Sequence, residues 1–264
     1  MRSKLCFNLL VAGVIGAAAV PASAQVVYVA SSNGQIGKLD VLTGGYTLIN
    51  ASPGALIGGL GFHSGVLYGL DSGANLDTIN QTTGQATLVG PTGQSVSGGW
   101  GLGATNDGAV YMQGDGQVST VNLTSGASTP LPSSLGFATG SVLAGDPSGN
   151  LYIDDTGNGN LYSVNRSTGA PSLIGTMSAL VGQTPDALCW TDGALYAITL
   201  QGGIYRVSVS DASAVQVANF SVGNDGAIWA AASNYSATTP EPFTLALCVA
   251  GLGLAGRRMR QRTK

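Results

Sequence analysis

The sequence predicts an all-β protein, a β-propeller of four-stranded repeats, most simply one with five blades. Three observations predict this fold class. A motif recurs about every 40 residues, as expected of a repeat fold. Between the two ends, Gly, Ser, Thr and Val are abundant whereas Glu and Lys are scarce, which disfavours helices and suits strands joined by tight turns. The last strand-like segment matches the strand that the first repeat lacks.

Each repeat contains a strand centred on a tyrosine. The five tyrosines are separated by 40, 43, 41 and 44 residues, and they are Tyr28, Tyr68, Tyr111, Tyr152 and Tyr196. Their neighbours in the strands are mostly apolar, as in VVYVA and NLYID. We therefore expect one tyrosine per blade in the core, rather than a row of rings that bind a ligand.

Two further strands follow each tyrosine strand. The first of them lies in QIGKLD, NLDTIN, QVSTVN, NLYSVN or GIYRVS, and the next lies in GYTLIN, QATLVG, ASTPLP, APSLIG or AVQVAN. In the first four repeats a Thr-Gly or Ser-Gly turn separates the two, at Gly44, Gly84, Gly126 and Gly169. Glycine readily adopts the positive φ that tight hairpin turns require, which favours a hairpin at each position.

A fourth strand precedes the tyrosine strand in every repeat except the first. These strands are predicted at Gly59–Phe62, Gly101–Ala104, Val142–Gly145 and Ala187–Trp190. A fifth segment of the same character, Gly226–Ser233, follows the last repeat. Pairing it with the first repeat would close a ring of five blades and remove the open sheet edges that favour aggregation. A ring of six blades, a β-sandwich and an open β-solenoid are the alternatives.

The first 24 residues are predicted to be a secretory signal peptide. A short basic start, an apolar run and the small residues Ala22-Ser23-Ala24 follow one another in the order that signal peptidase substrates show. We expect export by the Sec machinery and cleavage between Ala24 and Gln25. The repeats then occupy a domain at residues 25–235.

The C-terminal residues 236–264 predict a second targeting signal. Their apolar run, Phe243–Gly256, has 14 residues, whereas a membrane-spanning helix usually has about 20. We expect a short transmembrane helix. Arginines follow it and would keep that end on the cytoplasmic side of the inner membrane, with the repeat domain outside.

This C-terminal stretch resembles the PEP-CTERM sorting signal of exported bacterial proteins. The resemblance rests on the triplet Pro240-Glu241-Pro242, the apolar run and the pair Arg257-Arg258, in that order. Thr239 is a departure, because many members have Val before the triplet. The resemblance implies an exosortase as processing enzyme, a transient membrane anchor and a final location at the cell surface or outside the cell.

The charge of the repeat domain excludes nucleic acid as a partner. Without the two signals, only three of the 10 basic residues remain, Lys38, Arg166 and Arg206, against 12 aspartates and no glutamate. The domain therefore has a net charge near −9. Nucleic-acid binding needs basic residues that neutralise phosphates, so this domain would repel it.

A cation site is the only metal site that the sequence suggests. Asp154, Asp155, Asn158 and Asn160 supply oxygen atoms in one predicted loop, and Ca²⁺ takes six to eight oxygens. The loop lacks the spacing and the closing Glu of a calcium-binding motif. Turn formation, which also favours Asp and Asn, is the simpler interpretation, so we expect no cofactor and no metal.

Nucleophilic catalysis has little support in the sequence. Cys189 is the only cysteine of the repeat domain and lies in the apolar run ALCW, where we expect it to be a buried small hydrophobic residue. His63 is the only histidine of the chain, and other repeats have turn residues at its place. No GxSxG motif accompanies a serine.

Two functions of different classes fit these observations. The first is a non-catalytic propeller at the bacterial surface or in the extracellular matrix that binds a protein or a glycan with its loops. The second is a lactonase-like, calcium-dependent propeller hydrolase. The hydrolase would need acidic residues at the mouth of the channel, and the only candidates next to innermost strands are Asp146, Asp186 and Asp225.

Intact-mass analysis of the protein from its own host tests both processing predictions. We expect a polypeptide that begins at Gln25 and ends near Pro240-Glu241-Pro242. A product that retains 257–264 would contradict the sorting prediction and indicate a permanent anchor.

Overall fold

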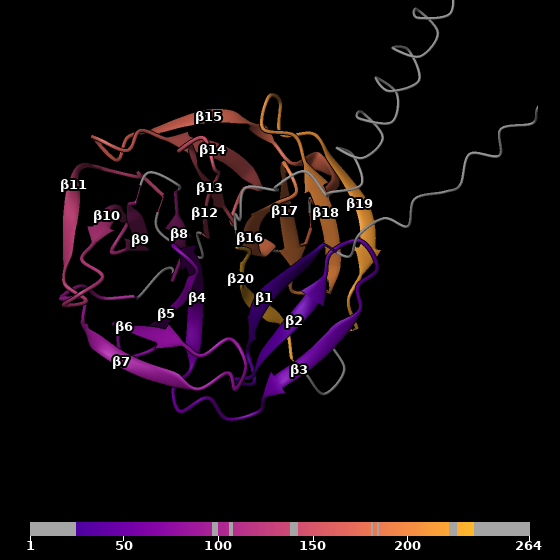
Figure 1. Cartoon of the computed structure of the whole chain (residues 1–264). Coiled ribbons are helices and arrows are strands. Elements are labelled where there is room, and N and C mark those ends of the chain that lie inside the picture. The colour runs from indigo at the N-terminus through magenta and orange to yellow at the C-terminus, as the bar shows by residue number, and fades with distance from the viewer. Residues whose placement is uncertain are drawn as a thin grey trace, which may run out of the picture.

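The computed structural model describes residues 25–96, 100–105, 108–137, 142–180, 182–183, 185–221 and 226–234. In this part of the chain, 20 strands form five four-stranded antiparallel sheets, which are arranged as blades around a central axis (Figure 1). The predicted five-bladed β-propeller is therefore confirmed.

The strands of each blade follow the order that the repeats predict, from the axis outward. Blade 1 has β20 (Ile228–Ala232), β1 (Val26–Ser31), β2 (Ile36–Asp40) and β3 (Tyr46–Asn50). Blade 2 has β4 (Ile57–His63), β5 (Val66–Asp71), β6 (Asn75–Ile79) and β7 (Ala86–Pro91). Blade 3 has β8 (Leu102–Ala104), β9 (Val110–Gly114), β10 (Gln117–Val121) and β11 (Ser128–Ser134). Blade 4 has β12 (Leu143–Gly145), β13 (Leu151–Asp155), β14 (Asn160–Val164) and β15 (Pro171–Thr176), and blade 5 has β16 (Pro185–Thr191), β17 (Ala194–Thr199), β18 (Gly203–Val207) and β19 (Ala214–Asn219).

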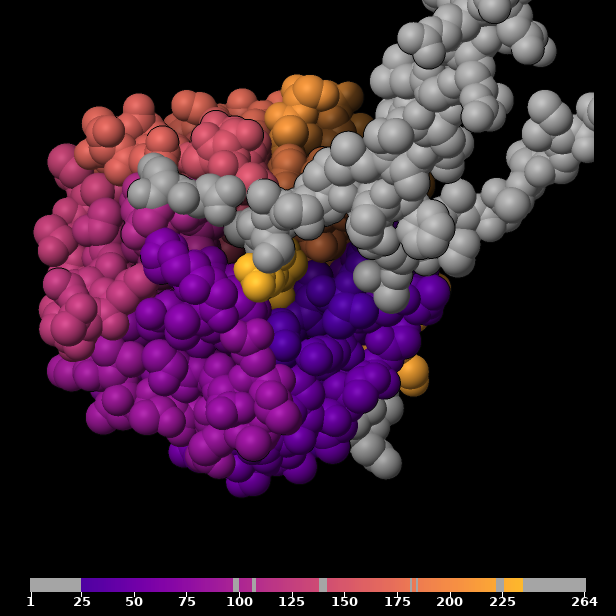
Figure 2. Space-filling view, in the orientation of Figure 1, coloured from indigo at the N-terminus to yellow at the C-terminus, as the bar shows by residue number. Residues whose placement is uncertain are grey.

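Blade 1 joins the two ends of the described chain. β20 pairs with β1 in an antiparallel register that places Tyr28 opposite Ala232 and Val29 opposite Ala231. Figure 2 shows the end of this part of the chain (yellow) against its beginning (indigo). The innermost strands β20, β4, β8, β12 and β16 contact one another in that order around the axis, and β16 contacts β20. This closure excludes an open solenoid.

The five tyrosines take part in the apolar packing, as predicted, and the structure places them between neighbouring blades. Tyr196 of blade 5 lies in one apolar cluster with Val27, Val29 and Leu39 of blade 1. The equivalent tyrosines pack in the same way: Tyr152 with blade 5, Tyr111 with blade 4, Tyr68 with blade 3 and Tyr28 with blade 2. The core is therefore five apolar layers between blades, not one central cluster.

The axis is filled because small residues let the innermost strands approach closely. A Cβ added to Gly59 would lie 2.0 Å from the carbonyl oxygen of Trp100, and one added to Gly145 would lie 2.0 Å from that of Ala104. Two cavities along the axis measure about 10 Å³ each. Each is room for about one water molecule and not for a larger ligand.

The outer hairpins owe their shape to a repeated Asn-x-x-x-Gly pattern. In blades 2, 3 and 4 an Asn side-chain oxygen accepts hydrogen bonds from the backbone N–H groups two and three residues later, at 2.9–3.1 Å. The glycine that ends each turn has a positive φ of 66°, 80° or 79°, at Gly84, Gly126 and Gly169. The sequence thus fixes these turns locally.

The two faces of the ring differ in what they carry. We call the lower face the one with the turns from innermost to second strands. Because β1 begins there and β20 ends there, Gln25 and Asn234 both lie on it. The upper face carries the connections from each outermost strand to the next blade.

The described residues contain one 3₁₀ turn, η1 (Ser178–Leu180), and otherwise strands and connections. The helices predicted in residues 1–24 and 236–264 lie outside the described residues. In the part that the structure covers, no helix is long and apolar enough to cross a membrane.

Adding one methyl group at the axis tests the close approach of the innermost strands. Gly59→Ala forces a Cβ against the Trp100 carbonyl and should cost about 3 kcal/mol, which lowers Tm by roughly 6–12 °C for a domain of this size. The matched control is Gly45→Ala, because a Cβ there would lie 3.3 Å from its nearest neighbour, Thr43 Oγ1. Equal Tm values for the two variants in thermal unfolding would contradict the packing described.

Candidate functional site

Two tryptophans lie at the upper end of the channel. Trp229 is the extra residue of a β-bulge between β20 and β1, and it lines the upper axial cavity. Its ring meets that of Trp100 edge-on, at 6.0 Å between centroids and an angle of 64°. Gly58 makes room for this pair, because a Cβ there would lie 1.8 Å from the Trp100 ring. Both tryptophans are partly exposed, so they form an aromatic surface at the channel mouth.

Asp154 and Asp186 lie toward the same end, at the contact of blades 4 and 5. The Asp154 side chain is fully buried, and its Oδ1 accepts a hydrogen bond from Val142 N at 3.0 Å. Its Oδ2 has no partner among the described residues. Burial, and secondly the negative charge of Asp186, raise the pKa of Asp154 well above its usual value.

The Asp186 carboxyl is also destabilised in its charged form. Partial burial raises its pKa to about 6. Burial thus disfavours the charged form of both carboxyl groups in this pair.

Gln113 occupies the position in blade 3 that Asp154 occupies in blade 4, two residues after the tyrosine. Its amide is buried, and neither side-chain atom has a partner among the described residues. In the other blades the same position holds Ala30, Leu70 and Ile198, which belong to the apolar layers. Two neighbouring blades thus replace core residues by polar ones below the upper face.

Three of the four candidate calcium ligands, Asp155, Asn158 and Asn160, lie in or beside one hairpin turn, and Asp154 points away from it. Asp155 accepts hydrogen bonds from Gly157 N at 3.2 Å and from Asn158 Nδ2 at 2.6 Å. Asn160 accepts one from Thr176 Oγ1 at 2.7 Å. Asp154 precedes Asp155 in β13, so its side chain points to the opposite face of the blade.

The acidic residues beside the innermost strands do not share one end of the channel. Asp146 lies in a turn of the lower face, where it accepts hydrogen bonds from Asn150 Nδ2 at 2.8 Å and from Tyr152 Oη at 3.2 Å. Asp186 lies at the upper end, and Asp225 is outside the described residues. Among the residues that the structure covers, no three His, Cys, Asp or Glu side chains are grouped to hold a metal ion.

The two potential nucleophilic or basic residues lie apart from these acids. Cys189 is buried in the layer between blades 5 and 1, as expected, and burial raises the pKa of its thiol to about 12. A thiol with that pKa is not reactive near neutral pH. His63 ends β4 on the lower face, where its Nε2 is 3.0 Å from Ser64 Oγ.

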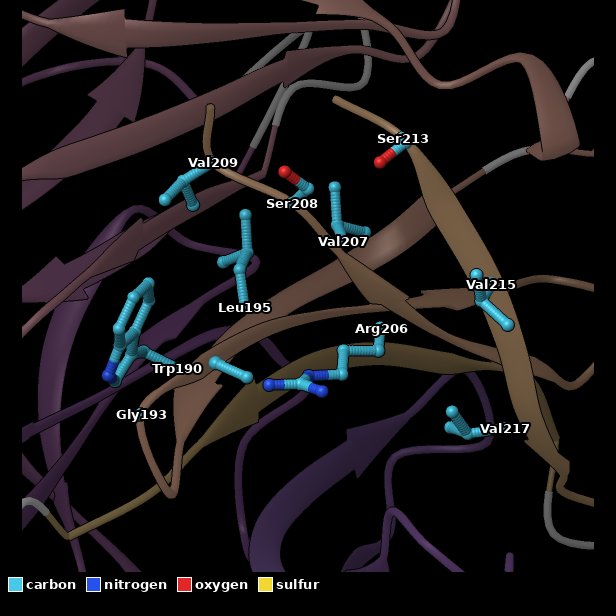
Figure 3. A pocket seen from close by; sticks show the side chains of 11 residues that line it. Trp190, Gly193, Leu195, Arg206, Val207, Ser208, Val209, Ser213, Val215 and Val217 are labelled. Atoms are coloured by element: carbon cyan, nitrogen blue, oxygen red, sulfur yellow. The ribbon is translucent and has the colours of Figure 1, made fainter. Parts of the chain in front are cut away.

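A sizeable pocket lies at the lower end of blade 5 (Figure 3). Its volume is about 530 Å³. Its walls come from the end of β16, the turn into β17, the end of β18 and the outermost strand β19, and they include Trp190, Arg206, Val207, Val215 and Val217.

Both ends of the described chain reach the border of this pocket. Ser233 Oγ donates a hydrogen bond to the carbonyl oxygen of Trp190. Gln25 Oε1 accepts one from Tyr196 Oη at 2.8 Å, and Gln25 Nε2 donates to Asp192, which adjoins the pocket residue Gly193. Residue 25, predicted to begin the processed chain, thus helps to hold blade 1 against blade 5.

The sequence alone predicts no role for this pocket. A signal was present, because Arg206 is one of three basic residues in an acidic domain and lies in a strand whose other residues are buried. Which residues of other strands surround it depends on the register of β18 with β17 and β19, which sequence periodicity does not fix.

The comparisons with known proteins agree with the fold. A family model described as a repeat of unknown function, DUF6923, matches residues 110–238, a little under half of the chain. The matched stretch begins at β9 and includes blades 4 and 5. No protein of curated function matches the sequence.

Solved structures with similar folds share little sequence with this chain. A chain of a nidogen/laminin complex has a TM-score of 0.55 at 12% identity, covering 79% of this chain and 97% of that one. A protein of unknown function from Bacteroides thetaiotaomicron has a TM-score of 0.51 at 16% identity, covering 74% and 58%. Virginiamycin B lyase from Staphylococcus aureus has a TM-score of 0.48 at 13% identity, covering 73% and 69%. At these identities the similarity concerns the fold alone.

The raised pKa of Asp186 predicts that removing its charge stabilises the fold at high pH but not at low pH. In the unfolded chain the carboxyl has a pKa near 3.8, so the folded state binds the proton more tightly up to a pH of about 6. The stabilisation that comes from this tighter proton binding is fully present below pH 3.8, the pKa in the unfolded chain. It is lost as the pH rises through about 6. Asp186→Asn should therefore raise Tm by a few degrees at about pH 8 and leave it unchanged at about pH 3.5.

Asp211→Asn is the control for that measurement. Hydrogen bonds from Ser208 and Ser213 lower the pKa of Asp211, so removing its charge should give no gain at high pH. A Tm difference between wild type and Asp186→Asn that does not change with pH would contradict the assignment.

Proposed function

We propose that this chain is an exported bacterial protein of the cell surface or extracellular matrix, whose propeller is a non-catalytic binding module. Its C-terminal stretch acts as a PEP-CTERM sorting signal. The observation that carries the proposal is the placement of β1 and β20 side by side, which attaches both predicted signals to the lower face. The ring is complete within residues 25–234, so neither signal supplies one of its strands.

The short connection to the sorting motif supports a defined orientation during processing. Asn234 is six residues from Pro240, and an extended chain of that length spans at most roughly 20 Å. A membrane helix that starts after Pro242 would hold the lower face close to the inner membrane. An exosortase-type enzyme acting at the triplet would then work beside this face.

The upper face would point away from the membrane in that orientation. It carries the aromatic surface of Trp100 and Trp229 and the partly exposed Asp186. Tryptophan rings and carboxylates are suited to binding a protein segment or a glycan, by stacking and hydrogen bonding. We propose that a surface protein or glycan binds there.

A non-catalytic role is consistent with the state of the residues that catalysis would need. The thiol of Cys189 stays protonated, the oxygens of Asp155 are used by a turn, and the channel is filled by its own strands. The net charge near −9 suits solubility in an extracellular environment. After release, the domain would remain a closed ring without the anchor.

Replacing the triplet tests the sorting proposal in a host that carries an exosortase. A variant with Pro240, Glu241 and Pro242 all changed to Ala should keep its tail and stay mostly in the membrane fraction, with the higher intact mass. The matched control changes Thr238 and Thr239 to Ala and should be processed like the wild type. Equal processing of the triple variant and the wild type would contradict the proposal.

A further inference from the structure

The pocket of blade 5 has the size and composition of a small-molecule site. Its volume of about 530 Å³ lies within the range of roughly 300–1,000 Å³ that is usual for ligand pockets. All the residues that line it belong to the described part of the chain. It lies on the lower face, away from Trp100 and Trp229, so it is distinct from the surface proposed above.

One side of this pocket is apolar. Val215 and Val217 on β19 are 68% and 37% exposed. Cross-strand pairing places Val215 opposite Arg206, on the same face of the blade. Trp190 and Val207 lie on the other face, because both pair with Leu195. The two valines therefore offer the apolar surface beside Arg206.

The other side carries a positive charge that no acidic residue of the lining accompanies. In Figure 3, Arg206 extends from β18 toward Trp190 and Gly193, across the base of the pocket. Its guanidinium presents N–H donors in a plane that matches a carboxylate. The nearby Asp192 carboxylate accepts a hydrogen bond from Gln25 and does not line the pocket.

We propose that this pocket binds a small amphipathic carboxylate. The carboxylate pairs with Arg206, and the hydrocarbon part lies against Val215 and Val217. Charge complementarity selects the site, because the domain has only three basic residues against 12 aspartates. An anion is therefore repelled from most of this surface and attracted here.

A sugar fits the lining less well. Besides Arg206, the polar side chains of the pocket are Ser208 and Ser213, and Ser213 Oγ already donates to Asp211 Oδ1 at 2.8 Å. A glycan unit needs several hydrogen-bonding partners, whereas the valines offer none. The donor set thus favours one anionic group on an apolar body.

Calorimetric titration with octanoate tests this proposal on the full-length chain. Wild type should bind octanoate at one site, and Arg206→Gln should weaken binding about tenfold or more, as expected for the loss of a charge-assisted pair. Val215→Ser should also weaken the binding of octanoate. 1-Octanol should bind the wild type less tightly than octanoate does, whereas the two compounds should bind Arg206→Gln equally.

Arg166→Gln is the matched control, since it removes the same charge in blade 4. All variants keep the arginines at 257–262, so attraction to that cluster cancels in the comparison. Equal weakening by Arg206→Gln and Arg166→Gln would mean non-specific attraction and would overturn the proposal. The proposal would also be overturned if octanoate did not bind to a wild-type protein that unfolds normally on heating. These outcomes do not depend on export or processing.

Discussion

The pairing of β20 with β1 is the interaction on which the rest of this structure depends. It places the last described strand innermost in blade 1, opposite Tyr28 and Val29. Without it, the apolar layers on both sides of blade 1 would lose an inner wall, because Ile228 and Ala231 belong to one layer and Ala230 and Ala232 to the other. Closing the ring in this way gives every blade a neighbour on both sides and leaves no open end to the array.

Closure with five blades also decides where function can reside. Five innermost strands of small residues approach so closely that the axis holds only cavities of about 10 Å³. Ligand binding must therefore use the faces and the outer ends of the blades. The upper mouth offers the tryptophan pair and the carboxyl groups of Asp154 and Asp186, and the lower end of blade 5 offers an apolar pocket with Arg206.

Most of the fold could be predicted from the sequence, because its determinants are local and repeated. The tyrosine spacing and the Thr-Gly or Ser-Gly turns recur along the chain, and the terminal segment supplies the strand that the first repeat lacks. The blades and their closure could therefore be predicted from the repeats. The candidate binding sites could not be predicted in this way. Asp154 and Asp155 are neighbours in sequence, but strand alternation sends them to opposite faces, and one became a turn residue. Trp100 and Trp229 meet only because the ring closes, and Arg206 lies beside Val215 through a cross-strand register that a single sequence does not specify.

Hydrogen–deuterium exchange of the segment 226–234 in the purified chain tests the closure most directly. If β20 pairs with β1, the amides of β20 that face β1 should exchange slowly. Their rates should match those of the amides of β16 that face β17, because β16 is the innermost strand of blade 5. Rapid exchange of 228–232 beside a protected β16 would show that the ring is open, and would remove the basis for placing both chain ends on one face.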